Sequence, residues 1–152
     1  MIQRIQSIFL FASLCFLVPM FFAPVAEMIY ETGEIFAFNL IGFSQTEANI
    51  TTTLSNQYSI MAFGILICVL NLIIIFLYKS RMLQLRLCIY NILLLAGLTG
   101  VVLFALYTVP DVRSVSFGLP AVFPIISIIL HYLAFRAIRR DDLMVKALSH
   151  LR

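Results

Sequence analysis

The chain alternates between long apolar runs and short polar connections. Four runs contain no Asp, Glu, Lys or Arg, at residues 7–26, 58–78, 87–109 and 118–135. A helix crosses the hydrocarbon core of a bilayer with about 20 residues, and each run is close to that length. The pattern therefore predicts an all-α membrane protein in which residues 1–152 form a single domain of four transmembrane helices.

The connection between the second and third runs is short and basic, with Lys79, Arg81 and Arg86 in eight residues. Such a short turn requires the two flanking helices to lie antiparallel and adjacent. Asn71 and Asn91 stand at equal distances from this turn, about 15 Å along each helix at 1.5 Å per residue. We hypothesise that the two amides form an interhelical hydrogen bond, because an unpaired amide in hydrocarbon is unfavourable.

An alternative interpretation of the same residues is a polar lining for a transport path, with Thr99 as a third member. His131, in the fourth run, has no second histidine within any run. We expect it to have a structural or hydrogen-bonding role near the inner end of its helix, rather than to relay protons or bind haem.

The polar segments differ in character. Residues 27–56 form the one sizeable outer loop, about thirty residues with four Glu and no Lys or Arg, and Gly33–Ser44 within it is typical of a strand or hairpin. Pro110–Phe117 is expected to be a short outer turn. The end of the chain, FRAIRRDDLMVKALSHLR, predicts a short amphipathic tail along the inner membrane face.

The distribution of Lys and Arg predicts the orientation of the chain in the membrane. With both termini in the cytoplasm, nine of the ten Lys and Arg residues lie inside and Arg113 alone lies outside. The first run has the shape of a signal peptide, but it is long for one, so we expect a retained first span. Its helix is expected to kink or end in its outer half, where Pro19 and Pro24 lie. Overall, 62% hydrophobic and 11% charged residues with a mean hydropathy of +1.07 agree with an integral membrane protein. The sequence therefore predicts a multi-pass membrane protein with both termini in the cytoplasm.

Several functions are disfavoured. The four runs lack the buried charges that ion-coupled transporters and membrane enzymes use, so we expect no enzymatic activity. No pair of cysteines has the spacing of a redox or metal site, and we expect no cofactor or metal. Cations at the membrane boundary are explained by topology, so nucleic acid is not an expected partner. The expected contacts are with other inner-membrane subunits and anionic lipid headgroups, through six cytoplasmic cations: Lys79, Arg81, Arg86, Arg136, Arg139 and Arg140.

Three stretches carry a family resemblance: MIQRIQS at the start, RMLQLRLCIYNILLL after the turn and LAFRAIRRDDLMVKALSHLR at the end. They resemble a family of small four-span inner-membrane proteins of the Bacteroidota, catalogued as a domain of unknown function (family 4293). The resemblance implies a bacterial inner-membrane location and brings no catalytic motif. We expect a non-catalytic accessory or assembly subunit of a larger complex, with protein export or insertion machinery and respiratory complexes as candidate hosts. The alternative is a small oligomeric transporter or channel for a neutral solute or lipid.

Overall fold

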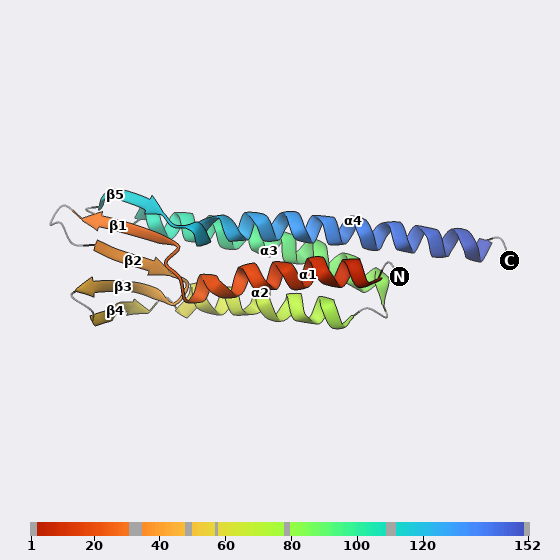
Figure 1. Cartoon of the computed structure of the whole chain (residues 1–152), viewed down its shortest axis with the longest axis horizontal. Helices are drawn as coiled ribbons and strands as arrows, with labels where there is room; N and C mark the ends of the chain where they lie inside the picture. Colours follow the sequence, from red (N-terminus) through yellow and green to blue (C-terminus); the bar gives the residue numbers. More distant parts are fainter. Residues whose placement is uncertain are drawn as a thin grey trace.

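Long helices form a bundle, and a β-sheet covers one end of it (Figure 1). The computed structural model describes residues 3–30, 35–47, 50–56, 58–77, 80–108 and 112–150. Both ends of the chain lie at the end of the bundle opposite the sheet (Figure 1). The prediction of a mostly helical protein is confirmed, but an all-α fold is wrong because of this sheet.

The helices follow the four apolar runs, with shifted ends. They are α1 (Gln3–Leu17), continued by the 3₁₀ helix η1 (Val18–Phe21); α2 (Tyr58–Phe76); α3 (Arg81–Thr108); and α4 (Phe123–His150), preceded by the 3₁₀ helix η2 (Leu119–Val122). Three of them are long and apolar enough to cross a membrane, and the apolar helix Gln6–Phe21 is shorter. These helices indicate a membrane protein.

The first helical segment ends earlier than the apolar run that predicted it. The run extends to Ala26, whereas the helix changes to 3₁₀ geometry at Val18 and ends at Phe21. Pro19 occupies the first turn of η1, where a missing N–H is tolerated, and its carbonyl accepts from the N–H groups of Phe22 and Ala23. The remaining residues of the run lead into the first strand.

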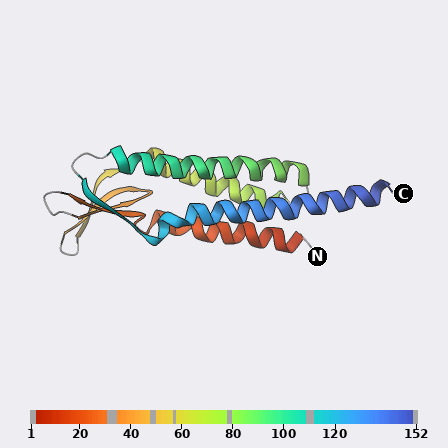
Figure 2. The ribbon, with the colours of Figure 1, turned by 90° about the horizontal axis from the view of Figure 1, so that it is seen from above.

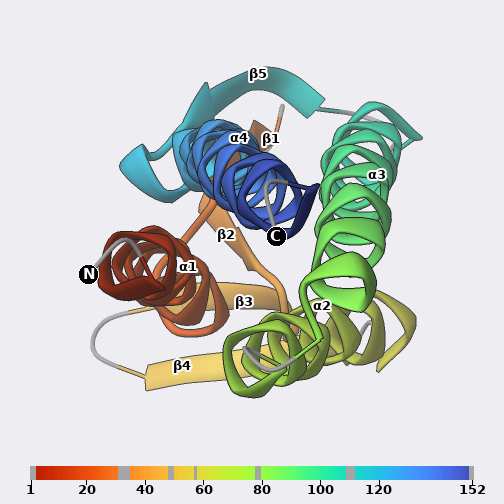
Figure 3. The same cartoon turned by 90° about the vertical axis from the view of Figure 1, so that its right-hand side faces the viewer.

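The helices pack as a closed ring in which each touches two neighbours. Contacts join α1 to α2 and α4, and α3 to α2 and α4 (Figure 3). The adjacent α2–α3 hairpin predicted from the basic turn is thus confirmed. Tyr78 and Lys79 of the turn itself lie outside the described residues.

One buried stripe along each helix faces the centre of the ring. Its positions are three or four residues apart, the spacing of a coiled-coil seam. The buried positions are Gln6, Leu10, Ser13 and Leu17 on α1; Ile60, Gly64, Ile67, Asn71 and Ile74 on α2; Gln84, Cys88, Asn91, Leu95, Leu98, Val102 and Leu106 on α3; and Pro124, Ser127, His131, Ala134 and Ile138 on α4. The bundle therefore has a continuous seam that is mostly apolar but contains polar side chains at defined levels.

The sheet is antiparallel and has the strand order β4-β3-β2-β1-β5. Its strands are β1 (Ala26–Tyr30), β2 (Ile35–Asn39), β3 (Gly42–Glu47), β4 (Ile50–Asn56) and β5 (Val112–Phe117). The strand or hairpin predicted within residues 33–44 is confirmed by β2 and β3. The prediction of a loop for the rest of residues 27–56, and of a turn at residues 110–117, is wrong where strands form. Strand β5 pairs with β1 across the molecule, Ala26 opposite Phe117, and this partner is distant in sequence.

Local chemistry sets the β2–β3 turn. The side-chain oxygen of Asn39 accepts from the N–H groups of Ile41 and Gly42 at 3.1 and 3.0 Å. Gly42 has a φ of 154°, in a region that side-chain-bearing residues avoid. The tight turn places Phe38 and Leu40 in the core between the sheet and the bundle.

The C-terminal segment is part of α4. The sequence predicts a separate amphipathic tail lying along the membrane, whereas α4 is one helix of 28 residues that extends to His150. It projects past the ends of the other three helices (Figure 2). The helix continues because residues 136–150 contain no Gly or Pro to end it.

Candidate functional site

A cluster of polar side chains lies at the centre of the bundle and takes one or more members from every helix. Its members are Ser13 of α1, Asn71 of α2, Asn91 of α3, and Ser127 and His131 of α4, and all five have no exposed surface. All of them stand on the buried seam. We call these five residues the central polar cluster.

The cluster is held together mainly by His131. The imidazole Nε2 lies 2.8 Å from the Asn91 side-chain nitrogen, and Nδ1 lies 3.1 Å from the Ser13 hydroxyl oxygen. Nδ1 is also 2.9 Å from the Ser127 carbonyl oxygen of its own helix. Asn71 Nδ2 donates to Ser13 Oγ at 3.4 Å, and Ser127 Oγ donates to the Ser13 carbonyl at 3.4 Å.

These contacts determine which imidazole nitrogen of the neutral ring carries the proton. A carbonyl oxygen can only accept, so Nδ1 of His131 is the protonated nitrogen and donates to Ser127, with Ser13 Oγ as a second acceptor. Nε2 is then the acceptor for the amide N–H of Asn91. The arrangement fixes both the histidine tautomer and the orientation of the Asn91 amide.

The hydrogen bond expected between Asn71 and Asn91 is not formed. The side-chain oxygens of both residues are buried and have no hydrogen-bond partner, while their nitrogens bond to Ser13 and His131. Each amide thus points across the interface with α1 or α4 rather than across the α2–α3 hairpin. The predicted similar depth of the two amides fits their membership of one cluster, but the predicted pairing is wrong.

The cluster bridges three of the four helix–helix interfaces. Asn71 to Ser13 joins α2 to α1, Ser13 to His131 joins α1 to α4, and His131 to Asn91 joins α4 to α3. A polar residue on the seam of a helical bundle specifies register, because any shifted packing would leave it without its partner. The arrangement thus fixes the axial register of all four helices relative to one another.

Sequence reasoning missed two members, Ser13 and Ser127. For His131 the sequence predicts a structural or hydrogen-bonding role, and the hydrogen bonds of the cluster agree with it. A signal was present: each of these residues occupies a seam position three or four residues from buried apolar neighbours. That spacing becomes informative only once the seam of each helix is known.

A second pair of buried amides lies closer to the termini. Gln84 Nε2 donates to the carbonyl of Ile74 at 3.2 Å, joining the start of α3 to the end of α2. Gln6 is also buried, and its side-chain nitrogen has no partner. Leu10 and Cys88, four residues further along the two helices, belong to the smaller of two apolar core clusters.

Six cations are expected from the sequence to contact partners or lipids. Arg86, Arg136, Arg139 and Arg140 are exposed. Arg81 begins α3, but its side chain, like the whole of Lys79, lies outside the described residues. Arg139 and Arg140 lie three and four residues after Arg136, so the three lie on one broad side of α4.

The described residues contain no group of three or more His, Cys, Asp or Glu side chains that could hold a metal ion. Cys15 is exposed, Cys68 half-buried and Cys88 buried, and all three are free thiols. The polar chemistry of the described bundle is therefore that of neutral amides, hydroxyls and one imidazole.

Comparison with known proteins places the chain in a family. A family model described as "Domain of unknown function (DUF4293)" matches residues 2–151. Because the match covers nearly the whole chain, the chain belongs to this family. Among curated proteins, none matches it. The resemblance drawn from the sequence is confirmed at the level of the family.

Proposed function

We propose that this member of the DUF4293 family is a four-span protein of the bacterial inner membrane, in the Bacteroidota, and a non-catalytic accessory or assembly subunit of a larger complex. Both termini lie in the cytoplasm, and the sheet lies outside. Partners are other inner-membrane subunits, with export or insertion machinery and respiratory complexes as candidate hosts.

The length of the first helical segment supports a fourth span. Fifteen residues of α1 and four of η1 extend about 30 Å at ~1.5 and ~2.0 Å per residue, which equals the hydrocarbon thickness of about 30 Å. This segment also supplies one side of the closed ring (Figure 3). Without it, Asn71 and His131 would lose their Ser13 partner.

The distribution of cations supports the orientation. The two termini and the α2–α3 turn lie at one end of the bundle, and the sheet lies at the other (Figure 1). Arg113, in β5, is the one Lys or Arg of the sequence assigned to the sheet end. The other described cations lie on the helices toward the terminal end, the pattern of a cytoplasmic face: Arg4, Arg81, Arg86, Arg136, Arg139, Arg140 and Lys146.

The observation that carries the accessory role is the central polar cluster. Hydrogen bonds at one level link all four helices, so a sliding or opening motion would break several of them in an apolar surrounding. A bundle held in this way suits a fixed scaffold that presents the end opposite the sheet to other proteins. The C-terminal part of α4, in which Arg139, Arg140 and Leu143 are exposed, supplies the cytoplasmic surface for binding a partner.

The test is native purification in mild detergent through a C-terminal tag, followed by mass spectrometry of co-eluting proteins. Recovery of other membrane subunits in fixed proportion is expected, and the variant Arg139→Glu/Arg140→Glu should reduce it. Arg113→Glu, a charge reversal at the other end of the molecule, is the matched control and should leave recovery unchanged. Purification of this chain alone would contradict the proposal.

A second candidate function is a small oligomeric transporter or channel for a neutral solute or lipid. The unpartnered amide oxygens of Asn71 and Asn91, buried at the bundle centre, favour it because they could bind a polar group in transit. Thr99 does not join them, since its hydroxyl donates to the Leu95 carbonyl of its own helix at 2.9 Å. A stable homo-oligomer giving flux in liposomes, lost on replacing both asparagines with Leu, would establish this alternative.

A further inference from the structure

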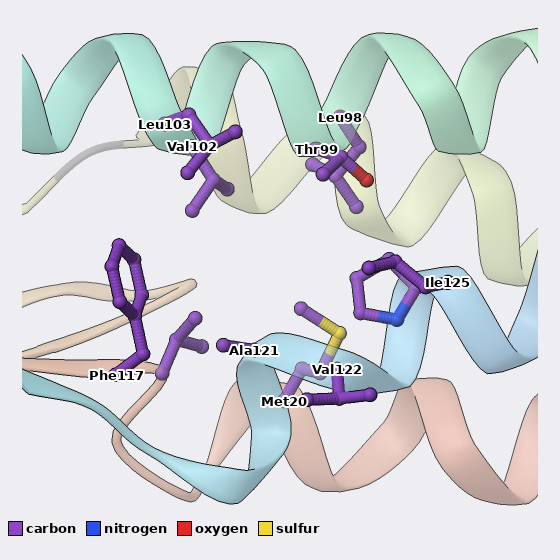
Figure 4. A pocket seen from close by; sticks show the side chains of 11 residues that line it. Met20, Leu98, Thr99, Val102, Leu103, Phe117, Ala121, Val122 and Ile125 are labelled. Atoms are coloured by element: carbon purple, nitrogen blue, oxygen red, sulfur yellow. The ribbon is translucent and has the colours of Figure 1, made fainter.

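An apolar pocket of about 240 Å³ lies between α3 and the start of α4, under the sheet (Figure 4). Its wall on α3 includes Leu98, Val102 and Leu103, and its opposite wall includes Ala121 and Val122 of η2. Further side chains close it from η1, the sheet and α4: Met20, Val25, Phe117, Pro124 and Ile125. The pocket is distinct from the central polar cluster and shares no residue with it.

The pocket contains no free side-chain hydrogen-bond donor that a polar ligand could use. Thr99 is the one lining residue with a side-chain hydroxyl, and that hydroxyl already donates to Leu95. All other lining side chains are hydrocarbon or thioether. The Thr99 oxygen can still accept one hydrogen bond, but a polar ligand would lose its other hydrogen bonds with water on entering, at a cost of several kcal/mol.

Exposed apolar side chains flank the pocket on the outer surface of the bundle. Val122 and Ile125 are 49% and 51% exposed, and Leu103 is 38% exposed. They belong to two of the helical segments that are long and apolar enough to cross a membrane. Leu98 and Leu103 lie about 8–15 Å from the sheet-side end of α3, at 1.5 Å per residue. In a membrane, this side of the pocket therefore faces the hydrocarbon chains of lipids.

The walls are held open by backbone contacts rather than by mobile side chains. Gly118 donates from its N–H to the Val25 carbonyl at 2.9 Å, and its own carbonyl accepts from Ala121 at 3.1 Å. A Cβ at Gly118 would lie 2.6 Å from the Pro24 carbonyl oxygen, so the two segments approach as closely as glycine permits. Pro120 and Pro124 then fix the backbone at the start of α4. These contacts keep the pocket formed without a ligand.

We propose that this pocket binds a single hydrocarbon chain of a membrane lipid, inserted sideways between α3 and α4. An engineered cavity of about 150 Å³ accepts benzene and excludes water, and on that scale 240 Å³ holds about ten carbon atoms. That is part of one chain and too little for a ring system with polar substituents. The chain belongs to a phospholipid acyl tail or to an isoprenoid lipid, which share this chemistry. The inference does not depend on the accessory role.

The test uses the full chain reconstituted in liposomes of phosphatidylethanolamine, a fraction of which carries a diazirine in one acyl chain. After photolysis, mass spectrometry maps the adducts. Wild-type adducts should concentrate several-fold on peptides that contain Met20, Leu98 and Phe117. Ala121→Leu, which fills the pocket, should reduce these adducts several-fold. Ala96→Leu, the same change at an exposed position of α3 outside the lining set, should not.

A second variant distinguishes a loss of lipid binding from misfolding. Val122→Phe places a bulky ring at the exposed rim, where the fold has space for it, and should also reduce the adducts while the thermal unfolding midpoint stays at the wild-type value. Adducts spread evenly over all exposed apolar residues, or unchanged by Ala121→Leu and Val122→Phe in folded protein, would overturn the proposal.

Lipid extraction from purified wild-type and Ala121→Leu protein distinguishes the two sources of the chain. A retained phospholipid that is depleted in the variant identifies an acyl tail, and a retained quinone or polyprenyl lipid depleted in the variant identifies an isoprenoid. Both results support the pocket assignment. Equal lipid retention by the two proteins would count against it.

Discussion

The bonding pattern of the central polar cluster predicts which pairs of residues are energetically coupled. Replacing His131 with Leu removes its contacts with Asn91 and Ser13 and leaves the Asn91 amide without any partner, because its oxygen is already unpaired. We expect a loss of about 1–3 kcal/mol in the free energy of unfolding, the usual cost of orphaning a buried polar group. Leu is used because its volume is close to that of His, which limits any cavity effect.

Double-mutant cycles then separate direct from indirect coupling. Interhelical hydrogen bonds in a membrane protein average about 0.6 kcal/mol and reach about 1.7 kcal/mol. The Asn91–His131 bond of 2.8 Å is the shortest in the cluster between two helices, so His131→Leu with Asn91→Leu should show the largest coupling. Ser13→Ala with Asn71→Leu, across 3.4 Å, should show less.

The cycle of Asn71 with Asn91 is the critical comparison. The two side chains have no direct hydrogen bond and are linked only through Ser13 and His131. Their coupling energy should therefore be the smallest of the three. It should be close to ~0.3–0.5 kcal/mol, the deviation from additivity found for independent sites. Reversible unfolding in mixed micelles titrated with a denaturing detergent measures all three cycles. A coupling of Asn71 with Asn91 equal to or above that of Asn91 with His131 would refute the assigned network and restore the hairpin pair.

Three further predictions concern packing and topology. A methyl group at Gly64 would lie 2.7 Å from the nearest side chain, so Gly64→Ala should lower the free energy of unfolding by about 1–3 kcal/mol. At Gly100 a methyl group would have no atom within 4 Å, so Gly100→Ala should be neutral or stabilising in the same detergent titration. Phe38 is fully buried between sheet and bundle, so Phe38→Ala should cost about 3–5 kcal/mol and lower the thermal unfolding midpoint; an unchanged midpoint would show that the sheet does not stabilise the bundle. In intact spheroplasts, Ser114→Cys should react with a membrane-impermeant maleimide and Arg140→Cys only after lysis, and the reverse pattern would contradict the proposed orientation.

The helices could be predicted because their cause is local. Uninterrupted apolar runs and the absence of charge indicate helices that face lipid, and the structure forms α2, α3 and α4 over these runs. Pro19 and Pro24 predict a kink or an end in the outer half of the first run, and the change to 3₁₀ geometry at Val18 confirms it. The strand that follows could not be predicted, because apolar sequence continues through residues 22–26 and β1 pairs with β5, which is distant in sequence. Hydropathy does not distinguish the end of such a helix from an apolar strand that follows it.

The sheet was only partly predictable, for a related reason. Strands β2 and β3 form a local hairpin with its own turn signal at Asn39, and that part was expected. Strand β5 was not, because residues 112–117 contain no signal for their partner and pair with β1 more than eighty positions away. A strand whose hydrogen bonds are all with a distant segment is specified by the fold that brings the two together.

The sequence by itself determined the class of protein, the positions of the helices and the presence of two amides at similar depth, because each of these follows from composition and from the fixed rise of a helix. Only the tertiary structure decided what those amides bond to. Adjacency in the chain favoured a bond between Asn71 and Asn91, but the direction of a side chain depends on how its helix is rotated about its own axis. That rotation is set by the seam as a whole, and it turns both amides toward Ser13 and His131 on the helices that close the ring.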